Sequence, residues 1–454
     1  MFLRHSALAA ASLIILCGCT ALGTPYVRPA LPPAPGWQTA ATQPRVAQQD
    51  WWTAFGSAEI NIVVATALTA NTDIASAALR AKRAALQAEQ AGSVLWPKLS
   101  GSISTSTSAT EGFLTQSHSV AVGASYEVDL WGRLSVQQAA GKLEALASKD
   151  DVEAARMTVV ASVIETYWRL GAANQQIVQA RKSLASVKQM QELVISQAKL
   201  GDVSRLDTNE IAQTLAAQQA SLSDLLQARD ALRGTLAVLL DGQPSPVAEP
   251  TALPSRTPIR VATGLPADLL ANRPDLRAAE LRLRGTLKGV DAARSSLYPQ
   301  LTLTGKLGSS SADLSNLLSN PIATLGSGLL LPFLNFREGQ LAVRVSELQY
   351  EEAVLSFRRT LLSAFNDVGI ALSARTRLSE KMALVGQSLA AAQEAEALTE
   401  RRYRAGEIAL RIWLDAQERR RSAQAAITAV RLEQLLNEVQ LFRVLGTSPM
   451  TAGL

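Results

Sequence analysis

Residues able to do enzyme chemistry are scarce in this chain of 454 residues. It contains two histidines, His5 and His118, and two cysteines, Cys17 and Cys19. A single histidine beyond the first residues is too little for His-based acid–base catalysis or a His-rich metal site. The sequence also lacks the glycine-rich phosphate-binding loop, the zinc-protease motif and the nucleophile elbow. We therefore predict that the protein is not an enzyme, binds no metal and needs no cofactor.

The two cysteines lie in a segment whose chemistry is lipid attachment. Residues 7–16 form a run of ten apolar or small residues, which is the length of a signal-peptide core and too short to span a bilayer. The following LCGC, residues 16–19, resembles the lipobox of bacterial lipoproteins. That resemblance implies a signal peptide at 1–18 and a covalent lipid on Cys19, and Thr20 favours the outer membrane. An ordinary secretory signal that contains cysteine is the alternative.

The charged residues are those of a solvated surface. Asp, Glu, Lys and Arg make up 18% of the chain, below the roughly 25% of an average soluble protein. The net charge is +5, and the basic residues are scattered without a stripe of interleaved aromatic residues. We therefore predict that the protein does not bind nucleic acid.

Two proline-rich segments divide the chain. Residues 24–37 contain five prolines and residues 242–266 contain six, so both favour extended backbone over helix. We assign 19–56 to an N-terminal lipid-anchored segment and 243–265 to a linker between two halves. The last residues, 447–454, are assigned to a short tail.

The two halves resemble each other in sequence. Asp73–Leu99 aligns without a gap on Asp275–Leu301, and nine of the 27 positions are identical. In each half, a helix-like run is followed by strand-like segments, a very long helix, a glycine and another helix. We predict two structural repeats, at 57–242 and 266–446.

The strand-like segments alternate weakly between apolar and polar residues. They come in pairs, at about 98–131 and 300–335, and the individual candidates are 98–110, 119–132, 300–310 and 322–336. Their length and weak alternation are typical of transmembrane strands. Because four strands cannot close a barrel and lipid tolerates no open sheet edge, a membrane sheet requires several copies of the chain. A small soluble sheet is the alternative.

The same helix–proline–strand junction occurs once in each half. Pro97 and Pro299 are expected to end the preceding helix, because proline disfavours helical geometry in the residue before it. Trp96 and Tyr298 then fall where an aromatic belt at the membrane boundary is expected.

Two very long helices are predicted, at about 134–199 and 339–403. Apolar residues in the first recur in steps that average 3.5, which is a coiled-coil period. A helix of this length extends about 100 Å. Gly201 and Gly406 follow the two runs and are expected to form the turns at their tips, since glycine accepts the left-handed conformation.

Several motifs carry a resemblance to a known family. After the lipobox, the chain contains, in order, YEVDLWGRL at 126–134, LPADLLANRPDLRAAELRL at 265–283, YRAG at 403–406 and LDAQ at 414–417. Together they resemble the outer-membrane factors of bacterial tripartite efflux pumps. The match is to their NodT-type, OprM-like lipoprotein branch in the TolC superfamily, and it covers essentially the whole mature chain.

The resemblance implies a mainly α-helical, internally duplicated TolC-like duct with transmembrane β-strands. Each protomer of a homotrimer would give four strands to a 12-stranded barrel and long helices to a periplasmic α-barrel, with an equatorial domain around it. The implied function is the passive outer-membrane exit duct of a multidrug efflux system. Its partners would be a periplasmic adaptor, an inner-membrane RND pump and outer-membrane lipid. The alternatives are a TolC-like duct for type I protein secretion and a lipid-anchored periplasmic coiled-coil adaptor or scaffold.

The resemblance also places a gate at the periplasmic tip of the helices. An acidic residue nine positions after Gly406 corresponds to Asp415, and a tyrosine three positions before it corresponds to Tyr403. In TolC-like members this tyrosine bonds to an aspartate that corresponds to Asp207.

Three positions depart from the family's gate. Arg411 stands where OprM-like members have a constricting leucine, Ile412 where TolC has an aspartate, and Glu418 where an arginine is common. We expect Arg411 and Asp415 from three chains to form a ring of alternating charge that tightens the closed tip in a salt-sensitive way. In the alternative, these are solvated charges on a helix face.

Overall fold

The computed structural model describes residues 23–29, 50–110, 113–254, 273–319 and 321–446. The predicted signal peptide, Cys19 and the tail at 447–454 lie outside the described residues, as does the second part of the predicted linker.

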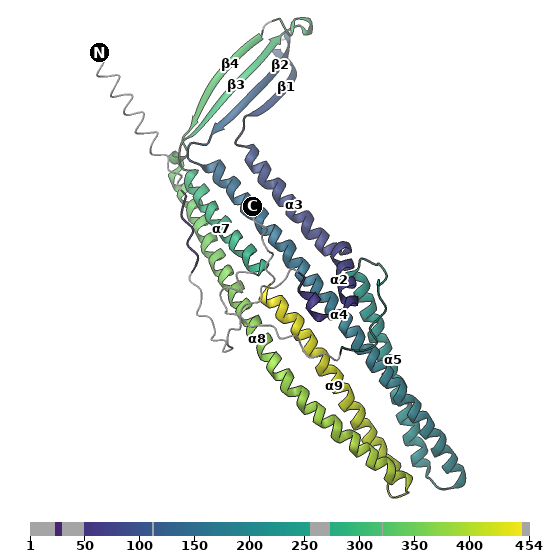
Figure 1. Ribbon diagram of the computed structural model, residues 1–454. Helices are drawn as coiled ribbons and strands as arrows, with labels where there is room; N and C mark the ends of the chain where they lie inside the picture. Colours follow the sequence, from purple (N-terminus) through teal and green to yellow (C-terminus); the bar gives the residue numbers. More distant parts are fainter. Residues whose placement is uncertain (1–22, 30–49, 111–112, 255–272, 320, 447–454) are drawn as a thin grey trace. The chain divides into compact units, whose positions relative to one another are not determined.

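The elements follow the order expected from the duplication (Figure 1). The first half contains η1 (Trp51–Phe55), α2 (Ala58–Ala70), α3 (Thr72–Ser93), β1 (Lys98–Thr110), β2 (Phe113–Val128), α4 (Arg133–Leu200) and α5 (Arg205–Leu239). The second half contains α7 (Pro274–Ser295), β3 (Gln300–Ser311), η2 (Leu314–Asn316), β4 (Pro321–Leu330), η3 (Pro332–Asn335), α8 (Phe336–Arg404) and α9 (Leu410–Leu445). The predicted long helices are confirmed, because α4 has 68 residues and α8 has 69.

Contacts group the chain into two compact units. One consists of residues 1–32, 78–151 and 275–361, and it includes all four strands. The other consists of residues 33–77, 152–274 and 362–454, and it includes α5 and α9. Both long helices contribute residues to each unit.

The four strands form one antiparallel sheet in the order β1-β2-β3-β4. The predicted bounds of β2 and β4 were wrong. β2 begins six residues earlier than expected and ends at Val128, where the Asp129 carboxylate accepts hydrogen bonds from the amides of Leu134 and Ser135 and so caps α4. β4 ends at Leu330, because the chain then turns into the short helix η3.

The core of the second unit is apolar and aromatic. It joins η1 and α2 to the middle of α4 and to the ends of α5 and α9. Trp51 stacks on Phe442 with ring centroids 5.1 Å apart, and Phe55 meets Trp168 edge-on at 4.8 Å. Although aromatic residues are only 5% of the chain, their concentration here fastens α4 to its own protomer.

Among the described residues, no single helix is long and apolar enough to cross a membrane. α2 and α3 taken together reach the required length and apolar composition, but the pair is bent by 43° at the break between them.

Candidate functional site

The register of the sheet sorts its side chains onto two contrasting faces. Residues directly opposed in an antiparallel pair share a face. Ile103 opposes Val120, and Val122 opposes Leu307. The face that results is apolar on all four strands and contains Leu99, Ile103, Val120, Val122, Ala124, Tyr126, Val128, Leu301, Leu303, Leu307, Ala323, Leu325 and Leu329.

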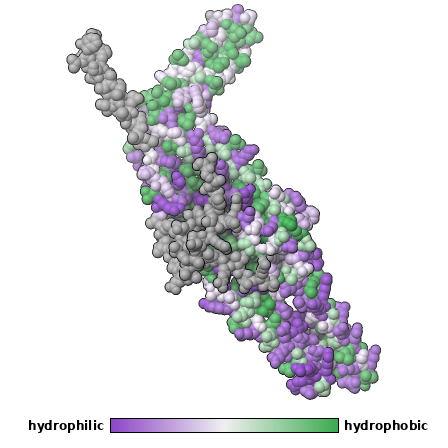
Figure 2. Space-filling model, viewed as in Figure 1, coloured by the Kyte–Doolittle hydropathy of each residue, from purple (hydrophilic) through white to green (hydrophobic). Residues whose placement is uncertain are grey.

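The opposite face is built from small and polar residues. It contains Ser100, Ser102, Ser104, Ser119, Gly123, Ser125, Thr302, Thr304, Gly308, Ser310, Thr324, Gly326 and Gly328. Apolar residues gather over the strands in Figure 2. Ile103 is 82% exposed and Leu325 is 92% exposed. The first face is mainly apolar, although the register also places Thr105, His118, Ser309 and Ser327 on it. A sheet with one mainly apolar exposed face and one polar face suits a wall between lipid and water.

Both edges of the sheet are open. β1 and β4 lie at its two ends, and each has one neighbouring strand within the protomer. Every residue of β4 is exposed. Edge strands of 13 and 10 residues leave rows of backbone donors and acceptors that must pair with another chain if the sheet enters lipid.

The two helix–strand junctions have the predicted residues between the elements but differ in their contacts. Trp96 and Pro97 lie between α3 and β1, and Trp96 is 73% exposed. Tyr298 and Pro299 lie between α7 and β3. Here Trp131 stacks on Tyr298 at 4.8 Å and donates its indole N–H to the carbonyl of Pro299 at 2.8 Å. Trp131 lies in the YEVDLWGRL motif at 126–134, but the sequence did not predict its role at the junction.

Both glycines predicted at the tips end their helices in the left-handed conformation. Gly201 has φ of +84° and Gly406 has φ of +74°. The amides of Gly201 and Asp202 donate to the carbonyls of Ala198 and Gln197. The amides of Gly406 and Glu407 bond in the same way, to the carbonyls of Tyr403 and Arg402. Each turn is therefore a complete Schellman motif, which satisfies the last carbonyls of a long helix.

The expected bond between Tyr403 and Asp207 is not the one that forms. The Tyr403 hydroxyl donates to Oε1 of Gln197 at 3.4 Å. Asp207 instead accepts bonds from the amide and hydroxyl of Ser204 at 2.9 and 2.7 Å, in a capping box that starts α5. Burial raises the pKa of Tyr403, and the charge of Asp207 adds to the effect.

Tyr403 is fixed by packing that sequence reasoning missed. Its ring lies 5.1 Å from that of Trp413, in a small buried cluster with Val194, Ile211 and Leu410. This cluster joins the tips of both hairpins, because its members come from α4, α5 and α9. Trp413 stands seven residues after Gly406, so an aromatic residue in the first turn of the returning helix was the available signal.

The charged residues assigned to the gate lie on the surface of α9. Arg411, Asp415 and Glu418 are all exposed. Glu418 forms an ion pair with Arg421 on the same helix. Arg411 and Asp415 are one turn apart and so share a face, and within the described part of the chain neither has an ion-pair partner.

Comparison with known proteins decides the family. The model of the outer membrane efflux protein family matches residues 63–242 and 265–447, which together are most of the chain. The chain belongs to the outer membrane efflux protein family. It is an outer-membrane exit duct with the TolC-like fold, and its predicted localisation and fold class are confirmed.

Relatives and structures agree along nearly the full length. The chain is 32% identical to the pyoverdine export outer membrane protein OpmQ of Pseudomonas putida, over 98% of this chain and 97% of that protein. It is 26% identical to the probable outer membrane lipoprotein SilC of Salmonella typhimurium, over 97% and 98%. The crystal structure of the CmeC outer membrane channel of Campylobacter jejuni has a TM-score of 0.85, with 23% identity, over 95% of this chain and 96% of that one.

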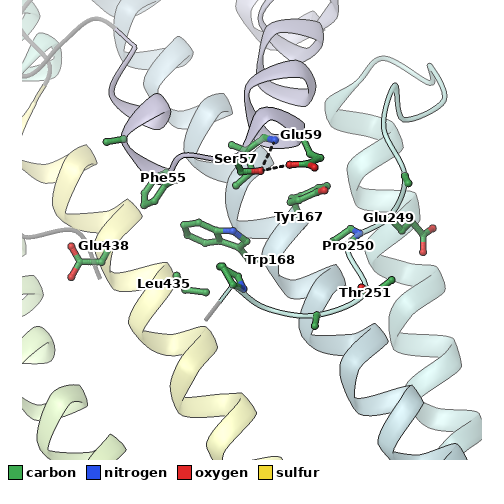
Figure 3. Close-up of a pocket in the computed structure, with 15 residues that line it drawn as sticks. Phe55, Ser57, Glu59, Tyr167, Trp168, Glu249, Pro250, Thr251, Leu435 and Glu438 are labelled. Atoms are coloured by element: carbon green, nitrogen blue, oxygen red, sulfur yellow. Dashed lines mark hydrogen bonds between the residues drawn. The ribbon is translucent and has the colours of Figure 1, made fainter. Parts of the chain in front are cut away.

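One cavity in this efflux protein lies within the second unit. It has a volume of about 560 Å³ and is lined by Phe55, Ser57, Trp168, Pro250 and Leu435 among others (Figure 3). Ser57 caps α2 by accepting from the amide of Ile60, and it donates to Glu59 at 2.8 Å. Ser57 and Glu59 are thus engaged in starting α2.

A buried carboxyl borders the same cavity. Glu438 of α9 is 2% exposed and lies 3.3 Å from Arg375 of α8, and its other oxygen has no hydrogen-bond partner among the described residues. Burial raises its pKa to about 7. Figure 3 shows this side chain pointing away from Trp168, so it belongs to the contact between α8 and α9.

Members of this family are channel proteins. In the described residues, no group of three or more His, Cys, Asp or Glu side chains is arranged to hold a metal ion.

Proposed function

We propose that this chain is the homotrimeric, passive exit duct of a tripartite RND-type efflux system. In this proposal it is anchored by a lipid on Cys19 and opened at its helical tip by a periplasmic adaptor and an inner-membrane pump. The observation that carries the proposal is the four-stranded sheet, with one apolar face, one polar face and two open edges. The repeats of the duct would be residues 57–242 and 266–446, joined by the linker at 243–265.

The open edges favour assembly of several chains. Each unpaired backbone group in lipid costs several kcal/mol. If β4 of one protomer pairs with β1 of the next, three sheets close into a 12-stranded barrel and no edge remains. The apolar face then meets lipid, and the polar face lines water.

An apolar stripe on α8 supports the same assembly. Leu341, Val345, Leu348 and Leu355 are all exposed in the protomer. Their spacings of four, three and seven residues place them on one side of the helix. Such a stripe is expected to pack against a helix of a neighbouring protomer.

The N-terminal segment supports a lipid anchor near the strand junctions. Thr24 donates its amide and hydroxyl to Asp291 at 3.1 and 2.7 Å, and Tyr26 and Arg28 both contact Glu280. Thr24 is thereby fixed about one turn from the end of α7, just before Tyr298. Because five residues span at most about 18 Å, a lipid on Cys19 would reach the same membrane boundary as the aromatic junctions. The lipoprotein name of the relative SilC agrees with this proposal.

The proposed gate uses charges at the tip. Arg411 and Asp415 from three protomers would alternate around the axis, while Tyr403, held by Gln197 and Trp413, keeps the two hairpins together. The alternative, in which Arg411 and Asp415 are solvated charges, predicts no effect of their removal on conductance.

The proposal is tested with the purified full-length protein. We expect a heat-modifiable trimer on gels and single-channel conductance in planar bilayers, with conductance rising in Asp415→Ala and Arg411→Ala. A protein that stays soluble and monomeric without its lipid, with no conductance, would contradict the duct. Unchanged conductance in both tip variants would leave the duct but place its gate elsewhere. The adaptor alternative does not fit a chain whose fold matches an outer-membrane channel over almost its full length.

A further inference from the structure

The polar face of the sheet carries two lysines in a field of neutral residues. Lys306 of β3 opposes Gly123 on one side and Thr324 on the other, and Lys98 of β1 opposes Ser125. All of these positions belong to the serine- and glycine-rich face. Both lysines are exposed.

The two lysines lie close to each other. The register places Lys98 in the row of Ser125 and Thr304, and Lys306 in the adjacent row, which contains Gly123. Two strand spacings and one step of two residues along a strand separate their Cα atoms, which is about 12 Å. The two charges therefore form one local cluster within each protomer.

Among the described residues, no carboxylate forms an ion pair with Lys98 or Lys306. Glu127 is the one carboxylate on the polar face of the described strands, and it lies 2.6 Å from Arg133 at the start of α4. The residues opposite and diagonal to Lys306 are serine, threonine, glycine, alanine and isoleucine. Glu127 stands diagonal to Lys98 across β1 and β2, but Arg133 engages its carboxylate, and within the described part of the chain neither lysine forms an ion pair.

We propose that Lys98 and Lys306 form a cationic band in the lumen of the barrel that makes the exit path prefer anions, such as carboxylated, phosphorylated or sulfonated small molecules. This rests on the proposed trimer, in which the polar face lines water and each of three protomers contributes two lysines. A charged, water-filled passage with low-dielectric walls concentrates ions of the opposite sign. Rings of lysine or arginine are a means by which pores select anions.

The neutral surroundings let the band act on passing solutes. Hydroxyls at Ser100, Ser125 and Thr304 on the same face offer hydrogen bonds to an anionic group. At physiological salt the screening length is about 8 Å. This is shorter than the Cα separation of about 12 Å, so each lysine acts on a passing anion as a separate charge of the band.

The test measures ion selectivity in planar bilayers under a KCl gradient. We expect the wild-type trimer to prefer chloride, and K98Q/K306Q to lower the anion-to-cation permeability ratio on the order of tenfold. The variant K98R/K306R is the matched control and should keep the wild-type ratio. A heat-modifiable trimer on gels verifies that each variant has assembled.

A second readout is independent of the tip. Inositol hexakisphosphate added from the extracellular side should block current in the wild type and in K98R/K306R, and should lose this block in K98Q/K306Q. A conducting K98Q/K306Q trimer with unchanged selectivity and unchanged block would overturn the band while leaving the duct intact. Absence of conductance in the wild-type protein would overturn the duct and the band together.

Discussion

The two long helices arose from one repeat, yet they are used differently. α4 and α8 are nearly equal in length, at 68 and 69 residues. α4 buries eighteen apolar side chains within the protomer, from Leu134 to Val194, whereas α8 buries six, from Phe357 to Ala371. The first helix is part of its own protomer's core, and the second keeps an apolar stripe exposed. Duplication therefore preserved the backbone while the packing partners diverged.

The contacts of the returning helices differ in the same direction. Asn437 and Gln434 of α9 donate to carbonyls of α8, and Lys381 pairs with Glu433 at 2.9 Å. α8 and α9 also share a small apolar cluster. Both α5 and α9 end in the aromatic and aliphatic core around α4. The contact between α8 and α9 therefore combines polar bonds with apolar packing, whereas the contact of α5 with α4 in this core is apolar.

The largest expected effect comes from placing a charge in the stripe of α8. Leu348→Glu should abolish the trimer, because a carboxylate would be buried against the neighbouring helix without a partner. Its effect on protomer helicity should be small. Light scattering after size-exclusion chromatography and circular dichroism measure the two quantities. Gln349→Glu, which is exposed beside the stripe, is the control and should remain trimeric; a trimeric Leu348→Glu would show that α8 faces solvent.

The next effect concerns the core around α4. Trp168→Ala should lower the free energy of unfolding by about 3–5 kcal/mol, because it opens a cavity beside Phe55. The comparison variant Leu384→Ala, at a 64% exposed position of α8 outside the stripe, should change stability by less than about 1 kcal/mol. Denaturant unfolding of detergent-solubilised protein measures both. Equal losses in the two variants would contradict the division between the helices.

The melting temperature should depend on pH because of the buried Glu438 at the contact between α8 and α9. Since burial raises the pKa of Glu438 to about 7, the folded state binds this proton more tightly than the unfolded state does. Its stabilising contribution is complete below the unfolded pKa and is lost as pH rises through about 7. We expect the melting temperature to fall between pH 5 and pH 8, and Glu438→Gln to flatten that slope. Glu433→Gln, an exposed partner of Lys381, should leave the slope unchanged; a steep slope in Glu438→Gln would assign it to another group.

The smallest effect concerns the helix starts at the tip. α5 begins with a side-chain cap at Ser204, whereas α9 begins at Ala409 without one. Ser204→Ala should cost about 1 kcal/mol, and Ala409→Ser should stabilise by a similar or smaller amount. Hydrogen exchange of the first amides in α5 and α9 reports each cap directly. Unchanged hydrogen exchange in Ala409→Ser would mean that the first amides of α9 are satisfied by other groups.

Most local features were predictable because they follow backbone rules. The glycine turns and the positions of the long helices depend on residues near each other in sequence, and the structure contains both. The junction prolines were expected to end the preceding helices, but these helices end at Ser93 and Ser295, four residues before each proline. The hydrogen bond expected for Tyr403 was wrong for a reason also present in the sequence. Ser204 and Asp207 have the spacing of a capping box, so the carboxylate was already committed to its own helix.

The sequence by itself determined that the chain is a duplicated set of strands and long helices, with two strands in each half and four in the chain. Periodicity and turn residues act over a few positions, so they survive without knowledge of contacts. Only the tertiary structure decided which strand residues share a face, that Trp131 joins the second junction, and that α4 is buried where α8 is not. These depend on register and on contacts between residues more than a hundred positions apart, and no local pattern encodes either.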